Sequence, residues 1–146
     1  MTIKNLQHIE SITLLLEDAY LERTSNINNS IKTAKKALKL SQAIDNKTYI
    51  GKSLNQLALY HMIISDFEAS KRYSREAIAN FTPINDEQGI ADANYSIGSI
   101  HYKTNNYHTG LKYLLESLRV YRKYNDLHNQ SKVEKAVGTI YEYMGD

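Results

Sequence analysis

The 146-residue sequence contains no cysteine, no tryptophan and a single proline. The absence of cysteine excludes a disulfide framework and a thiolate metal site, and it suits a reducing cytoplasm. One proline leaves long stretches in which helices are free to run, and we expect Pro83 to lie between two helix ends. These absences leave the compartment open, and we expect a cytoplasmic protein that holds neither a metal ion nor a cofactor.

Neither charge nor hydropathy points to a nucleic acid or a membrane as the partner. The 18 Lys and Arg residues nearly balance the 16 Asp and Glu residues, and a net charge of +2 is too small to indicate nucleic-acid binding. The N-terminal segment contains only a short apolar run, interrupted by Glu10, Glu17 and Asp18, so it does not resemble a signal peptide. No other stretch approaches the length of a membrane span.

The main feature of the sequence is a forty-residue period. In register, the units run from 30 to 69, from 70 to 109 and from 110 to 146 without a gap. Residues 1–29 fit less well, because Ala19 matches Ala58 only if one residue is lost in a loop. A period in this range is typical of a solenoid or array. The columns that agree in type are the small residues Ala58, Gly98 and Gly138, the aliphatic residues Leu57, Ile97 and Val137, the rings His61, His101 and Tyr141, and the capping residues Asn46, Asp86 and Asp126.

Each unit contains two segments with helical periodicity, separated by a tight turn. Capping residue types in front of these segments indicate where the helices begin. No segment combines the alternation of a strand with flanking turn residues. We therefore predict an all-α fold in a single domain, residues 1–146, with helices at 2–23, 28–44, 47–64, 67–81, 86–104, 107–124 and 127–144.

These residues resemble the tetratricopeptide repeat. The family pattern L-G-x-x-Y followed by an aromatic after a turn is approached by Ile97, Gly98, His101 and Tyr107, and again by residues forty positions away. The unit is longer than the usual thirty-four residues, as in Pins-type scaffolds and in the repeat modules of bacterial signalling proteins. The resemblance implies a right-handed α-solenoid of about 3.5 helical hairpins, the last of them incomplete, and a non-catalytic role in binding proteins or peptides.

Gly98 lies in the middle of a predicted helix, where glycine costs about 1 kcal/mol relative to alanine. One explanation is that the helix breaks at this residue. The other is that a second helix approaches closely, which only a small residue allows. We favour close approach, because Ala58 and Gly138 occupy the same column of the repeat.

The resemblance also implies a concave groove, lined by the first helices of successive units, that is suited to a peptide or a helix. Tyrosine rings, a methionine and amide groups are adaptable binding side chains. A lysine–asparagine clamp for a terminal carboxylate is not expected, and plain solvent-facing helix is the alternative to a binding site. We predict that the groove is lined by Asn55, Leu59, Met62, Tyr95, Ser99, Tyr102, Lys132, Lys135, Thr139 and Glu142.

Catalysis has little support in the sequence. His61 and His101 share a column and are candidate metal ligands or general bases. No supporting motif accompanies them, and histidine in place of the repeat aromatic accounts for both. No phosphate-binding loop, dinucleotide fingerprint or nucleophile motif is present.

Four lysines lie on one face of the predicted helix at 28–44, at spacings of three and four residues. This face is either a docking surface for an acidic partner or a phosphate backbone, or the solvated convex side of a helix. The four residues are Lys32, Lys35, Lys36 and Lys39.

The last unit ends after its first helix, in the segment YEYMGD. Solenoids normally cover their final apolar face with a polar cap, so we expect Ile140, Tyr141 and Met144 to lack a covering partner. Two hypotheses follow from this expectation. Either the chain is the N-terminal sensing or scaffolding part of a larger signalling protein, or it forms a homodimer through its C-terminal helix.

Overall fold

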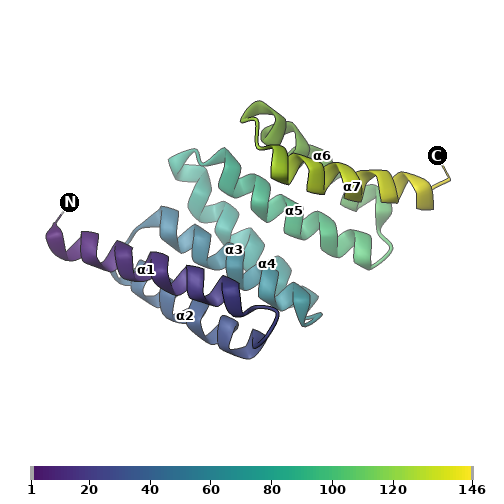
Figure 1. Ribbon diagram of the computed structural model, residues 1–146. Helices are drawn as coiled ribbons and strands as arrows, with labels where there is room; N and C mark the ends of the chain where they lie inside the picture. Colours follow the sequence, from purple (N-terminus) through teal and green to yellow (C-terminus); the bar gives the residue numbers. More distant parts are fainter. Residues whose placement is uncertain (1, 146) are drawn as a thin grey trace.

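Seven α-helices make up the computed structural model, which describes residues 2–145 (Figure 1). This part of the chain contains no strand, so the predicted all-α class is confirmed. Every predicted helix is observed with ends that differ by at most one residue, and Pro83 lies in a short 3₁₀ helix, η1 (Thr82–Ile84). The helices are α1 (Ile3–Glu22), α2 (Ile27–Ala43), α3 (Lys47–Ile63), α4 (Phe67–Phe81), α5 (Glu87–Lys103), α6 (Tyr107–Lys123) and α7 (Leu127–Tyr143).

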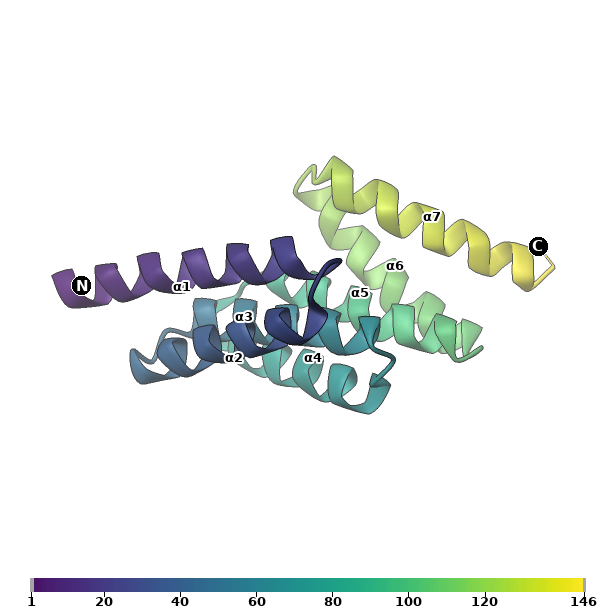
Figure 2. The same cartoon turned by 60° about the horizontal axis from the view of Figure 1, so that its bottom comes forward.

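The helices stack in chain order as antiparallel hairpins. Each helix packs against the next, and the odd-numbered helices also contact one another, α1 with α3, α3 with α5 and α5 with α7. Helices α1 and α7 therefore lie at opposite ends of the stack (Figures 1 and 2). The odd-numbered helices form one layer, and α2, α4 and α6 form the other. That these hairpins form a right-handed solenoid remains a prediction.

The five turns between α2 and α7 share one geometry, which makes the spacing of the helices regular. In the turn after α3, the N–H of Ser65 donates to the Met62 carbonyl (3.0 Å) and the N–H of Asp66 donates to the His61 carbonyl (2.8 Å). This pair of bonds satisfies carbonyl groups at the helix end and requires one residue with left-handed φ. These left-handed residues recur every twenty positions, at Asp45, Ser65, Asn85, Asn105 and Asn125.

The hairpin of α1 and α2 departs from this regularity. The Ser30 hydroxyl donates to the Ala19 carbonyl, eleven residues earlier, at 2.6 Å. The equivalent Ser70 hydroxyl donates to the Ala58 carbonyl, twelve residues earlier, also at 2.6 Å. One residue is therefore missing between Ala19 and Ser30. Helix α1 ends three residues after Ala19, whereas α3 ends five residues after Ala58, so the shortening lies at the end of α1. This deletion explains why residues 1–29 fit the forty-residue period less well.

Gly98 and Gly110 meet where α5 packs against α6. A Cβ atom on Gly98 would lie 2.9 Å from Leu114 Cγ and 3.1 Å from the Gly110 carbonyl oxygen. Helix α5 runs without interruption through Gly98, so a helix break is wrong and close approach explains the glycine. Gly138 does not share this environment, because no atom lies within 4 Å of a Cβ atom placed there.

Helix α7 buries most of its apolar residues despite its position at the end of the stack. Val133 and Ile140 are fully buried in a cluster with Leu114 of α6 and Ala91 of α5. The expectation that Ile140 lacks a covering partner is therefore wrong, because α5 and α6 cover it from one side. Tyr141 remains 37% exposed, as expected for the opposite face of α7.

Candidate functional site

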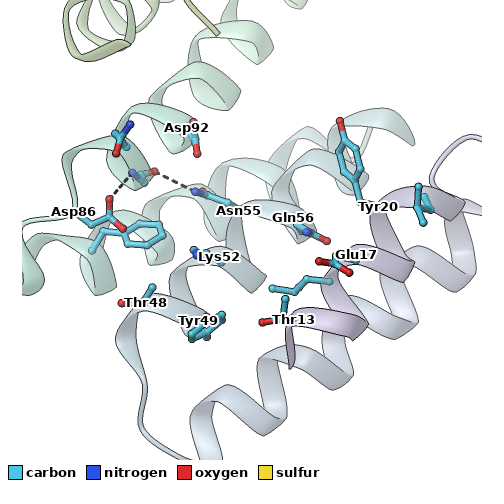
Figure 3. Close-up of a pocket in the computed structure, with 15 residues that line it drawn as sticks. Thr13, Glu17, Tyr20, Thr48, Tyr49, Lys52, Asn55, Gln56, Asp86 and Asp92 are labelled. Carbon is cyan, nitrogen blue, oxygen red and sulfur yellow. Dashed lines mark hydrogen bonds between the residues drawn. The ribbon is translucent and has the colours of Figure 1, made fainter. Parts of the chain in front are cut away.

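A groove of 810 Å³ lies between α1, α3 and α5, the first helices of three successive hairpins (Figure 3). Helical spacing places its side chains, because residues three, four and seven positions apart share one face of a helix. Thr13, Glu17 and Tyr20 come from α1 in this way. The wall from α3 and α5 includes Thr48, Tyr49, Lys52, Asn55, Gln56 and Asp92.

The ring of Phe81 lies against α3 and α5 beneath the groove. Gly51 of α3 and Gly89 of α5 both face this ring, and a Cβ atom on Gly89 would lie 2.7 Å from two of its carbon atoms. Phe81 is only 1% exposed. Two glycines on facing helices therefore make room for one aromatic ring, which separates α3 from α5 at this end.

A chain of hydrogen bonds joins α3 to the beginning of α5 on the same wall (Figure 3). The Asn55 amide donates to the Gly89 carbonyl at 3.1 Å, and the Gly89 N–H donates to Asp86 Oδ1 at 2.9 Å. The amide oxygen of Asn55 is buried and has no partner among the described residues. Asn55 thus lies at the predicted groove, but its amide nitrogen holds two helices together.

Three carboxylates and one ammonium group line the groove, those of Glu17, Asp86, Asp92 and Lys52. Asp92 lines the groove, and the protein packed around its carboxylate partly buries it although other atoms of the residue stay exposed. This burial raises the pKa of Asp92, while a hydrogen bond from the Tyr121 hydroxyl and the nearby charge of Lys132 oppose the rise. The groove is therefore acidic in a chain whose net charge is +2.

Two of the predicted groove residues, Tyr95 of α5 and Lys132 of α7, form a separate contact beyond this groove. The Lys132 ammonium lies 4.4 Å from the centre of the half-buried Tyr95 ring, a cation–π contact that connects α7 to α5. Burial lowers the pKa of Lys132, and the carboxylates of Asp92 and Asp126 oppose this shift. Ser99 is only 9% exposed, so its prediction as an exposed groove residue is wrong.

Tyr102 belongs to a group of three aromatic rings. Its centre lies 6.2 Å from those of Tyr107 and Tyr143, and the Tyr107 and Tyr143 rings stack at 5.7 Å. Tyr143 thus joins the end of α7 to two residues of the preceding hairpin, although its ring stays 64% exposed. Tyr102 therefore packs within the stack and is half-buried.

The remaining predicted groove residues lie outside the groove. Leu59 is half-buried beside Ala19 and Tyr60, and Met62 is half-buried near the end of α3. On α7, the Thr139 hydroxyl donates to the Lys135 carbonyl at 2.9 Å. Lys135 and Glu142 are exposed on α7.

Of the ten predicted residues, only Asn55 lines the groove, and the α1 wall was not predicted. Glu17 and Tyr20 do not align with groove residues at a spacing of forty, because one residue is missing from the first hairpin. Corrected by that one residue, Glu17 aligns with Gln56, and both line the groove. Lys52 and Asp92 are forty residues apart and so occupy one column of the repeat without any correction. This shared column is a feature of the sequence from which both groove residues could have been predicted.

The two histidines of the repeat each pack beside a tyrosine of the following helix. The rings of His61 and Tyr73 are 5.2 Å apart, and those of His101 and Tyr113 are 5.8 Å apart. His61 Nδ1 also lies 3.5 Å from Asp66 Oδ2. Within residues 2–145, no group of three or more His, Asp or Glu side chains has the arrangement of a metal site.

Comparison with protein-family models gives no match, and no curated protein sequence matches either. Among solved structures, the chain is similar to BtubC (BKLC) from P. vanneervenii, with a TM-score of 0.76 and 20% sequence identity. The similarity covers 92% of this chain and 57% of that protein, so the chain spans little more than half of its length. At this identity the likeness establishes the helical fold alone. In the described part of the chain, no helix has the length and apolar character needed to cross a membrane.

Proposed function

We propose that the protein is a non-catalytic, tetratricopeptide-type module that binds a polypeptide segment in the groove between α1, α3 and α5. The observation that carries this proposal is the 810 Å³ groove bounded by the first helices of three successive hairpins. Stacked helical repeats commonly use such a surface for binding. The forty-residue unit supports a place as the N-terminal sensing or scaffolding part of a larger signalling protein.

The chemistry of the groove favours a segment that carries Lys or Arg. Glu17 and Asp92 contribute carboxylates from opposite walls, and Lys52 is the single ammonium group of the lining. Leu16, Tyr20 and Tyr49 add apolar surface. A long basic side chain would bury its hydrocarbon stem on such surface while its charged end reaches a carboxylate.

The test is selection of peptides from a library of random twelve-residue sequences, followed by affinity measurement with the selected peptides. We expect enrichment of Lys and Arg, and at least about tenfold weaker binding by the Glu17→Gln/Asp92→Asn variant, because the loss of even one charged contact corresponds to about tenfold. Asn at position 92 retains an oxygen that accepts the Tyr121 hydroxyl, so the fold is preserved. The control variant, Asp18→Asn/Glu76→Gln, removes two exposed carboxylates that do not line the groove.

Two results would contradict the proposal. One is a library selection that yields no peptide with measurable affinity. The other is an equal loss of affinity in the groove variant and the control variant, which would reflect the general charge of the chain.

Self-association through α7 is a second candidate function, favoured by one observation. Gly138 has open space where its equivalent Gly98 has a packed helix, and Tyr141, three residues further along α7, is 37% exposed. A second copy that packed here would cover this ring. Sedimentation velocity over a wide concentration range decides the matter, since a monomer at every concentration contradicts self-association.

A further inference from the structure

Helices α2 and α4 carry a second charged surface, which is separate from the groove. We call it the basic face, and it consists of six exposed side chains on α2 and α4, those of Lys32, Lys35, Lys36, Lys39, Arg72 and Arg75. Helix α2 contains four lysines and no acidic residue. None of these six cations has a salt-bridge partner within residues 2–145.

The part of the basic face on α2 and the part on α4 occupy equivalent positions of the forty-residue repeat. Lys32 and Arg72 are forty residues apart, as are Lys35 and Arg75, and the pattern of exposure along α2 recurs along α4. Lys35 and Arg72 both lie near His61, where their positive charges add to the effect of burial in lowering its pKa. Side chains of two successive hairpins therefore contribute to one basic region, in which the exposed Glu76 of α4 stands where α2 has Lys36.

This region weakens at α6, where the exposed Lys112 still continues the column of Lys32 and Arg72 but the following positions change. Leu115 stands where α2 and α4 have Lys35 and Arg75, and it is 41% exposed. The neighbouring Glu116 and Arg119 form an ion pair at 2.7 Å. At the other side, a hollow of 400 Å³ lies among the lysines of α2, between their side chains and that of Leu38.

Like charges at these helical spacings repel one another. The 16 acidic residues of the chain are numerous enough to pair with these lysines, yet none of them faces α2 in a salt bridge within the described residues. A bound anionic partner would relieve this repulsion. An unpaired basic face that spans two hairpins is thus suited to a ligand with several closely spaced negative charges.

We infer that the basic face docks a short acidic polypeptide segment, rich in Asp and Glu. The net charge of the chain is only +2, so the surface outside the basic face carries an excess of acidic residues. A nucleic-acid duplex or a lipid bilayer extends well beyond two helices and would meet that excess. A short acidic segment interacts only within about 8 Å, the screening distance at physiological salt, and so experiences the basic face alone.

The probe for this inference is a fluorescein-labelled octaglutamate peptide, measured by fluorescence anisotropy at 0.05 and 0.15 M salt. We expect binding that weakens as salt rises, because surface charges are screened. The Lys32→Gln/Lys35→Gln/Arg72→Gln variant should bind the peptide at least about tenfold more weakly, as it loses charges from both helices. The control is the Lys4→Gln/Lys47→Gln/Lys103→Gln variant, which loses the same charge from exposed positions elsewhere and should bind within about twofold of the unmodified protein.

Three outcomes would overturn the inference. An equal loss of affinity in both triple variants would assign the binding to the net charge of the chain. Tighter binding to a twenty-base-pair DNA duplex or to phosphatidylserine vesicles than to octaglutamate, at 0.15 M salt, would assign the face to an extended polyanion. Concentration-dependent dimerisation that only the basic-face variant abolishes would identify a second copy of this chain as the occupant.

Discussion

Substituting alanine for glycine at two equivalent positions of the repeat separates helix propensity from helix packing. Gly98 and Gly138 both lie inside helices of seventeen residues, forty positions apart. Alanine is favoured over glycine in a helix interior by about 1 kcal/mol. This favourable contribution is common to the Gly98→Ala and Gly138→Ala variants, so it cancels when their stabilities are compared.

The packing contribution differs between the two sites. At Gly98 the new methyl group would lie 2.9 Å from Leu114 Cγ and 3.1 Å from the Gly110 carbonyl oxygen, so α5 and α6 must separate or Leu114 must move. Overpacking of this kind costs about 1–3 kcal/mol. At Gly138 no atom lies within 4 Å of the new methyl group, and only the gain in propensity remains.

We therefore expect Gly138→Ala to stabilise the protein by up to about 1 kcal/mol and Gly98→Ala to be less stable than Gly138→Ala by about 1–3 kcal/mol. Urea denaturation followed by circular dichroism measures both free energies of unfolding. If both variants gain stability equally, close approach is not the reason for glycine at position 98. A loss of stability in Gly138→Ala would show that its open space is filled in solution.

Two further predictions test the hydrogen bonds and the histidines. Ser70→Ala removes the bond to the Ala58 carbonyl and should cost about 1 kcal/mol in urea denaturation, whereas Ser11→Ala, at an exposed position of α1, should cost little. Burial, with nearby basic side chains, lowers the pKa of His61 and His101, so below pH 6.5 the unfolded chain binds protons that the folded chain does not. The melting temperature should fall between pH 7.5 and 5.5, and a fall of the same size in His61→Gln/His101→Gln would refute this reasoning.

The helices and their turns follow from local features of the sequence. Apolar periodicity and capping residues such as Asn46 and Asp66 place every helix to within one residue, because these signals act over a single turn of the chain. The capping residues also mark a turn that recurs every twenty positions. In each of these turns, one residue with left-handed φ directly precedes the N-cap residue of the next helix. The pairing of helices into hairpins follows equally from these short turns.

The position of the groove depends on contacts between helices that are distant in sequence. Its α1 wall was not predicted, because the residue missing from the first hairpin shifts Glu17 and Tyr20 out of the forty-residue register. Ser99 and Tyr102 have side chains that suit a binding surface, but packing buries one and places the other among tyrosine rings. A helical pattern specifies which residues share a face, and only the packing of α1, α3 and α5 decides which part of that face stays open.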